Sequence, residues 1–111
     1  MWAVIEKQCQ SWPVSIFMAG DVDAAKDICQ AYCDEVGFCV TVTPTTYVYT
    51  NGREAGFIVG LINYPRFPST PLLIQDHAQR LAVQLRETLG QQSYSIQTPA
   101  GTVWHSWRGE E

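Results

Sequence analysis

The strongest constraint on the fold is Asn51-Gly52, which separates two runs rich in β-branched and aromatic residues at 39–50 and 53–64. Asn and Gly adopt positive φ angles at low cost, so this dipeptide favours a two-residue turn and a β-hairpin. Pro44 has no N–H to donate to a neighbouring strand. The first strand is therefore expected at a sheet edge or with a bulge.

A turn centred on Asn51-Gly52 would set Val48 opposite Ala55 and Thr46 opposite Phe57. Side chains then alternate between two faces of the hairpin. One face is largely apolar and predicts the core: Val40, Val42, Pro44, Thr46, Val48, Ala55, Phe57, Val59 and Leu61. The other face mixes Thr, Tyr, Gly and Ile: Cys39, Thr41, Thr43, Thr45, Tyr47, Tyr49, Glu54, Gly56, Ile58, Gly60, Ile62 and Tyr64. Gly56 and Gly60 could leave room on this face for a ligand or for the Tyr47 ring.

The chain before the hairpin reads as strand and helix. Residues 12–19 predict a strand, and residues 2–9 could form a shorter one. Asp21 is a suitable N-cap for a helix with an apolar stripe at helical spacing over 22–36. Gly37 is placed to end that helix.

The chain after the hairpin adds a second helix and more strands. Three prolines within 65–71 predict a stiff irregular loop. Ser69 or Thr70 can cap a helix with Pro71 at its first position, and apolar residues recur along it to residue 89. Residues 92–98 and 102–108 then read as strands.

This order predicts one α+β domain over residues 1–111, of the ferredoxin-like split β-α-β type with an antiparallel sheet. Extra strands could extend it at the N- and C-termini. Both helices must bury their stripes on one sheet face, which leaves the other face uncovered. Candidate binding residues are those of the uncovered face and of the loop that follows the hairpin: Tyr47, Tyr49, Ile58, Ile62, Tyr64, Arg66 and Phe67.

Composition narrows the classes of partner. The net charge is −4 and the seven basic residues are scattered, which disfavours nucleic-acid binding even though an uncovered sheet with tyrosines resembles an RNA-stacking platform. No apolar stretch approaches about 20 residues, so no membrane span is expected. The N-terminal run lacks the features of a signal peptide, which predicts a cytoplasmic location in a bacterial host and reduced thiols at Cys9, Cys29, Cys33 and Cys39.

Reactive side chains form no recognisable catalytic pattern. Cys29 and Cys33 lie on the apolar stripe of the first helix, which fits small core residues better than a metal or redox site, and no CxxC occurs. His77 and His105 lack a motif that would supply a nucleophile, so a surface or packing role is expected. Acidic residues early in the first helix complement its dipole. We therefore predict no catalytic residue, no metal and no cofactor.

The run from Gly20 to Pro68 resembles small proteins encoded by bacterial viruses and prophages. The similar parts are the Gly20-Asp21 helix start, Cys29 and Cys33, CVTVTPT at 39–45 and GLINYPRFP at 60–68. The resemblance implies a viral or prophage origin and implies no catalytic residues.

Three functions remain open. The first is a non-enzymatic binding protein that engages a protein partner, such as a host factor, or itself as a homodimer, through the uncovered face and the 64–68 loop. The second is an enzyme or small-molecule binder with a pocket on that face in a ferredoxin-like dimer, favoured by a closed cavity containing His105 or Cys39. The third is a minor component of a phage particle.

Overall fold

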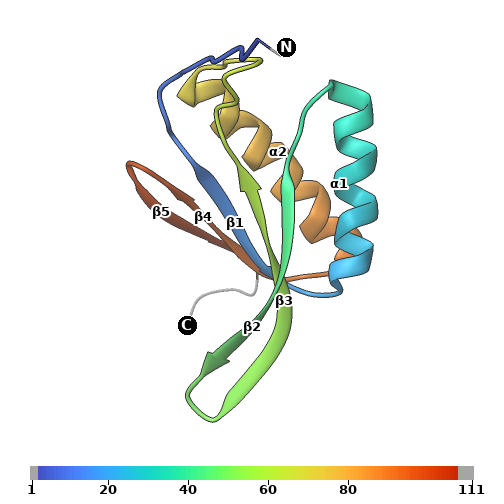
Figure 1. Cartoon of the computed structure of the whole chain (residues 1–111). Coiled ribbons are helices and arrows are strands. Elements are labelled where there is room, and N and C mark those ends of the chain that lie inside the picture. The colour runs from blue at the N-terminus through green and yellow to red at the C-terminus, as the bar shows by residue number, and fades with distance from the viewer. Residues whose placement is uncertain (1–2, 108–111) are drawn as a thin grey trace.

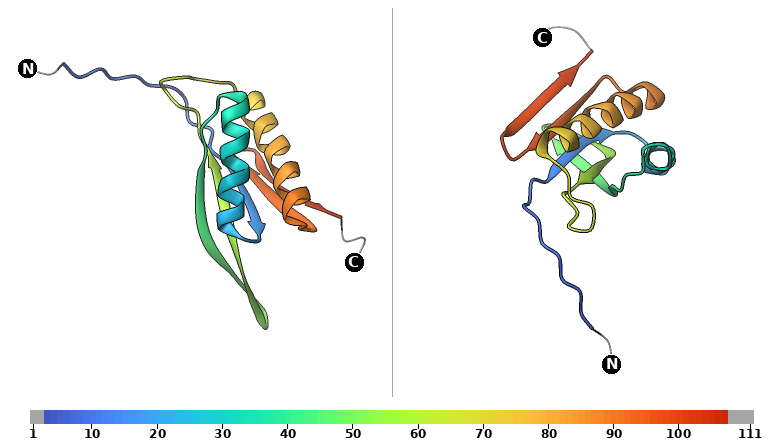
Figure 2. Two further views of the ribbon diagram at one scale, coloured as in Figure 1. Left: turned by 90° about the vertical axis from the view of Figure 1, so that its right-hand side faces the viewer. Right: turned by 90° about the horizontal axis from the view of Figure 1, so that it is seen from above.

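The computed structural model describes residues 3–107, which form a five-stranded antiparallel sheet and two helices. The elements in chain order are β1 (Val14–Ala19), α1 (Val22–Val36), β2 (Thr41–Tyr49), β3 (Gly52–Leu61), α2 (Pro71–Leu89), β4 (Ser93–Thr98) and β5 (Gly101–Ser106). The sheet order is β2-β3-β1-β4-β5. Both helices cover the same face of the sheet (Figures 1 and 2). The predicted ferredoxin-like α+β architecture is confirmed, with β5 as the extra C-terminal strand.

The helices begin and end where local chemistry predicts. The Asp21 carboxylate accepts a hydrogen bond from the Asp23 N–H at 3.0 Å, and the Thr70 hydroxyl accepts one from the Leu73 N–H at 3.2 Å. These caps satisfy backbone donors that the first helical turn leaves free. Gly37 and Gly90 end the two helices in the left-handed conformation.

One hydrophobic core lies between the helices and the sheet. The helices contribute residues of the predicted stripes, and the three central strands contribute alternate positions. The buried apolar residues are Val14, Ile16, Met18, Ala25, Cys29, Tyr32, Phe57, Val59, Leu61, Ile74, Ala78, Leu81, Ala82, Leu85, Tyr94 and Ile96. Because these residues occupy one face of each strand, the opposite face is uncovered by any helix, as the sequence predicts.

The hairpin differs from the prediction in its register. Its central residues are Thr50 and Asn51, with Asn51 at φ 64°, and Tyr49 pairs with Gly52. A side chain at Gly52 would place its Cβ 2.6 Å from the Tyr49 ring, so only glycine lets that ring lie across the strand. The pairing predicted for Val48 was therefore wrong: it faces Arg53 instead of Ala55. The shift is two residues, so the assignment of side chains to faces is unchanged.

The core face of the hairpin is only partly buried. The hairpin extends beyond both helices (Figure 1), which leaves Pro44 and Thr46 exposed and Val48 71% exposed. β2 is an edge strand paired to β3 without interruption, so Pro44 marks an edge and not a bulge. An edge strand can accommodate Pro44, which has no N–H to donate, because only one side of an edge strand forms hydrogen bonds to a neighbouring strand.

The two ends of the described chain differ from the predicted strands. Residues 3–13 form no strand, and residues 3–8 extend away from the rest of the molecule (Figure 2). The prediction of a short strand at residues 2–9 was therefore wrong for residues 3–9, and Trp2 lies outside the described residues. Arg108, the last residue of the strand predicted at 102–108, also lies outside them.

Candidate ligand pocket on the open sheet face

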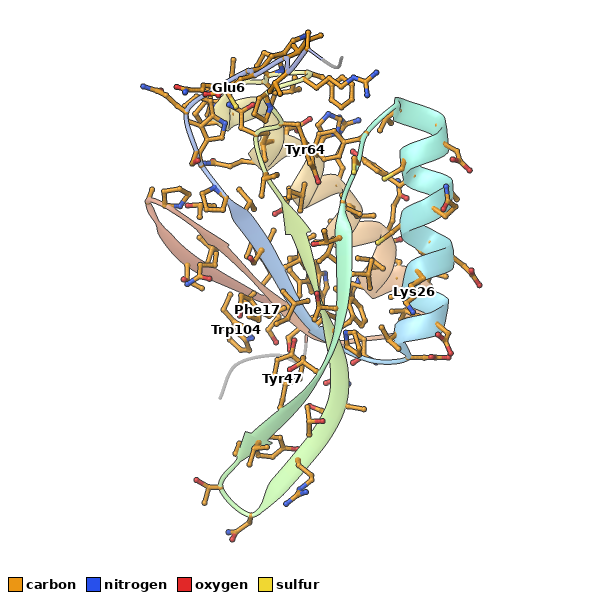
Figure 3. The ribbon with its side chains drawn as sticks, viewed as in Figure 1. Glu6, Phe17, Lys26, Tyr47, Tyr64 and Trp104 are labelled. Carbon is orange, nitrogen blue, oxygen red and sulfur yellow. The ribbon has the colours of Figure 1, made fainter. Side chains whose placement is uncertain are left out.

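The sheet face that carries no helix, here called the open face, contains a hollow of about 440 Å³. Aromatic side chains line it from three different strands: Phe17 from β1, Tyr47 from β2 and Trp104 from β5. Figure 3 shows the three rings gathered near the point where the hairpin leaves the sheet. Polar groups form more of its surface than apolar groups do, so the hollow suits a small organic ligand that carries both an aromatic part and polar or charged groups.

Tyr47 is held in place by its own hydroxyl and by a glycine. The hydroxyl donates a 2.7 Å hydrogen bond to the carbonyl oxygen of Phe57. The ring lies over Gly56, where an added Cβ would approach it to 2.5 Å. The prediction that a glycine makes room for Tyr47 is thus confirmed at Gly56. Burial raises the pKa of Tyr47, with Glu54 as a lesser cause, which keeps the phenol protonated as a donor.

Glu54 gives the pocket its charge. It pairs with Tyr47 across β2 and β3, so both side chains project from the open face. It is the only charged residue among those that line the pocket, and within residues 3–107 it has no ion-pair partner. Neutral polar residues complete the wall: Gln91, Gln92, Ser93 and Ser95. The pocket can therefore hold an aromatic ring system together with a positive charge.

The predicted binding residues separate into two groups. Tyr47 and Ile58 lie on the open face, and Tyr49 lies farther along the hairpin, over Gly52. Ile62, Tyr64 and Phe67 instead line a second cavity, of about 500 Å³, against the first turns of α2 and the end of α1. Arg66 stands in the same loop, its guanidinium 5.7 Å from the centroid of the Phe67 ring.

The expected placement of Ile62 and Tyr64 beside Tyr47 was wrong because strand alternation stops at Leu61. Asn63 follows and is buried, where its side-chain amide donates to the Gln10 carbonyl at 2.9 Å. Its side-chain oxygen accepts from the Ser69 N–H at 2.7 Å. These bonds turn the chain out of the sheet plane, so positions beyond Leu61 no longer follow the period of two.

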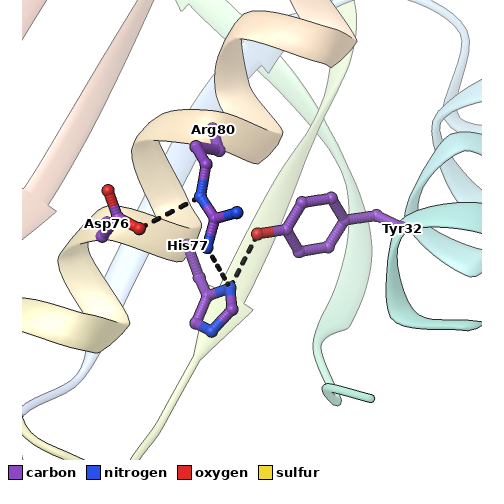
Figure 4. Close-up of polar contacts among 4 residues, drawn as sticks. All are labelled: Tyr32, Asp76, His77 and Arg80. Atoms are coloured by element: carbon purple, nitrogen blue, oxygen red, sulfur yellow. Dashed lines mark hydrogen bonds and ion pairs between the residues drawn. The ribbon is translucent and has the colours of Figure 1, made fainter. Parts of the chain in front are cut away.

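Both histidines have packing partners. The Tyr32 hydroxyl lies 2.7 Å and an Arg80 nitrogen 3.4 Å from Nδ1 of His77 (Figure 4), and the Phe38 ring stacks on the imidazole at 4.4 Å. Burial, with Arg80 as a second cause, lowers the pKa of His77. His105 stacks on Tyr94 at 5.1 Å. His105 does not line the open-face pocket.

The cysteines are free thiols in the structure. Cys29 is a buried core residue, as predicted, and burial raises its pKa to about 12, with Cys33 as a second cause. Cys39 is exposed and donates to the Tyr64 hydroxyl at 3.4 Å, which also raises the pKa of Tyr64 to about 12. Among residues 3–107 no three metal-ligating side chains come together.

Sequence reasoning missed Phe17, Glu54 and Trp104 as pocket residues. The alternation of Val14, Ile16 and Met18 placed Phe17 on the face away from the core, and this signal was available. Trp104 lies opposite Ser95 in the β4–β5 hairpin, and Ser95 lies opposite Phe17 because β4 pairs with β1. The second pairing joins segments far apart in the chain, so it cannot be read from the local sequence.

The fold and the pocket define an α+β protein of ferredoxin-like architecture with a ligand-sized hollow on its uncovered sheet face. Two solved structures of a phage SAM lyase share this fold, and each match covers 98% of this chain and 100% of the other. The apo enzyme has a TM-score of 0.69 at 18% identity. The complex with S-methyl-5'-thioadenosine has a TM-score of 0.65 at 15% identity. No family model and no curated protein matches the sequence.

These similarities contradict the expectation of a non-enzymatic binding protein, because the two solved structures that match over the whole chain are of an enzyme. At these sequence identities the structural similarity establishes the fold and does not by itself establish the activity. Neither helix in the described part of the chain has the length and apolar character required to cross a membrane.

Proposed function

We propose that the protein is an enzyme of the SAM lyase type, which releases S-methyl-5'-thioadenosine from S-adenosylmethionine in the open-face pocket. The observation that carries the proposal is the Glu54 carboxylate beside aromatic rings, in a fold shared over its whole length with a phage SAM lyase. A viral or prophage origin and a cytoplasmic location are part of this proposal, because S-adenosylmethionine is available to such an enzyme in the host cytoplasm.

The pocket chemistry fits the two ends of this substrate. Phe17 and Trp104 offer ring faces on which a purine can stack. Glu54 offers a negative charge to the sulfonium, which is a fixed cation. When the bond between sulfur and the γ-carbon breaks, its electron pair goes to sulfur and neutral S-methyl-5'-thioadenosine leaves. In the same step an oxygen of the substrate's own carboxylate forms a new bond to that carbon and closes a lactone, so the step needs no external nucleophile. Because the sulfonium is already an activated leaving group, this cleavage needs no metal or organic cofactor.

The role of Glu54 follows from where the charge changes. The sulfonium loses its positive charge as the bond breaks, so a carboxylate beside it stabilises the bound substrate at least as much as the transition state. Glu54 is therefore assigned to substrate binding and orientation. Replacing it should raise KM more than it lowers kcat.

The test is to incubate the purified full chain with S-adenosylmethionine and to quantify S-methyl-5'-thioadenosine by chromatography and mass spectrometry. We expect product from the wild type, a raised KM for Glu54→Gln and reduced product for Trp104→Ala. Glu35→Gln is the matched control, because Glu35 is an exposed glutamate on α1, away from the pocket. A folded wild type that neither forms product nor binds the substrate in calorimetry would refute the proposal.

A further inference from the structure

Two apolar surfaces have no partner within the part of the chain that the structure describes. The first is the N-terminal arm, residues 3–8, which is exposed throughout; Val4 is 88% and Ile5 83% exposed. The second is the cavity of about 500 Å³ lined by Ile62, Tyr64 and Phe67, here called the end cavity. Both lie at the end of the sheet away from the hairpin tip (Figures 1 and 3).

The arm leaves the body of the protein from a fixed point. The Cys9 thiol donates to the Asn63 carbonyl at 3.3 Å, and the Asn63 side chain donates to the Gln10 carbonyl. Before Cys9, no backbone-to-backbone hydrogen bond joins residues 3–8 to any other described residue, and Figure 2 shows the arm directed away from its own subunit. An extended segment with free backbone groups and exposed apolar side chains is suited to docking on another surface.

The end cavity has the complementary character. No lysine, arginine, aspartate or glutamate lines it, and aromatic or aliphatic side chains form most of its wall. Phe67 is 63% and Leu73 48% exposed at its rim. A contiguous exposed apolar patch of this kind marks an interaction site more often than a free surface.

We propose that the N-terminal arm of one copy of this protein occupies the end cavity of a second copy. Asn63 anchors the arm and is also the neighbour in sequence of two cavity residues, Ile62 and Tyr64, so arm and cavity emerge side by side on each subunit. Six extended residues reach about 20 Å, enough to cross to an adjacent subunit. Each copy then supplies both an arm and a cavity, so the exchange can close a symmetric assembly of two or more copies. The inference does not depend on the proposed enzymatic activity.

Light scattering on the full chain tests the exchange. We expect a mass that is a multiple of the 12.5 kDa chain for the wild type and a single-chain mass for the double variant Val4→Ser/Ile5→Ser. Glu6→Ser/Lys7→Ser is the matched control, because it changes the same arm without removing apolar side chains and should keep the assembly. The arm contributes nothing to its own subunit's core, so the serine variant should fold.

A cross-link identifies the occupant of the cavity. In Ile5→Cys, the new thiol should lie near Cys39, which lines the cavity and is exposed. Oxidation by copper phenanthroline removes one hydrogen from each thiol and joins two chains through a disulfide, which doubles the mass on a non-reducing gel. Cys39→Ser in the same background should abolish this product.

Three results would overturn the inference. They are a monomeric wild type, an assembly that survives Val4→Ser/Ile5→Ser, and a cross-link confined to one chain, which would show the arm folded onto its own cavity. The lyase assay is independent of all three, so failure of one proposal does not imply failure of the other.

Discussion

Gly56→Ala should damage both the sheet and the pocket. The new Cβ would lie 2.5 Å from the Met18 carbonyl oxygen, 2.9 Å from the Ala19 Cα and 2.5 Å from the Tyr47 ring. Two of these three contacts are backbone atoms of β1, which cannot rotate aside. Overpacking lowers the free energy of unfolding by about 1–3 kcal/mol, and we expect a loss near the upper limit of about 3 kcal/mol here because backbone atoms are involved. Alanine also restricts the unfolded chain more than glycine does, which raises the free energy of unfolding by only about 0.4–1 kcal/mol.

The expected net loss in the free energy of unfolding is about 2 kcal/mol. With a urea m-value of about 1.5 kcal/mol/M, the unfolding midpoint followed by circular dichroism should fall by roughly 1.3 M. Gly60→Ala is the matched control on the same strand and face, because its Cβ would approach only the exposed Thr41 side chain, which can rotate. If Gly56→Ala were as stable as the wild type, or if both variants lost stability equally, the packing argument would be wrong.

Three further predictions concern buried or capping groups. Asn63→Ala should lower the free energy of unfolding by about 1–3 kcal/mol in urea titrations, because the buried Asn63 side chain makes two hydrogen bonds, to the Gln10 carbonyl and from the Ser69 N–H, that alanine cannot make. Thr70→Ala should cost about 1 kcal/mol by the same measurement, since the Leu73 N–H loses its acceptor. Burial and Arg80 lower the pKa of His77, so the unfolded chain binds its proton more readily. The free energy of unfolding should therefore decrease as the pH falls below about 6.5, less steeply in His77→Gln, and an equal pH dependence in both proteins would contradict this.

Much of the local structure could be predicted because it depends on neighbours in sequence. Asp21 and Gly37 mark the ends of α1 through backbone hydrogen bonds within one helical turn. The two faces of the hairpin follow from strand alternation, which is why Tyr47 was placed on the open face although the register was wrong by two residues. In the observed register Tyr49 pairs with Gly52 and its ring lies over that glycine. The preference of Asn-Gly for a tight turn does not by itself predict this cross-strand contact.

The candidate site was only partly predictable. Tyr47 could be named from alternation, whereas Trp104 comes near it only because the β4–β5 hairpin pairs with β1, and β1 pairs with β3. Tyr64 was assigned to the same face because nothing in the local pattern shows that Asn63 is buried and interrupts the strand. The bonds responsible join Asn63 to Gln10, which is 53 positions away in the chain.

The sequence by itself determined the order of strands and helices, the helix ends and the sheet face that each helix leaves uncovered, because these depend on periodicity and on contacts within a few residues. Only the tertiary structure decided that Glu54 lies among the Phe17, Tyr47 and Trp104 side chains, and that Tyr64 faces a different cavity. Both depend on strand register and on buried long-range hydrogen bonds, whose free energy arises only when distant segments meet.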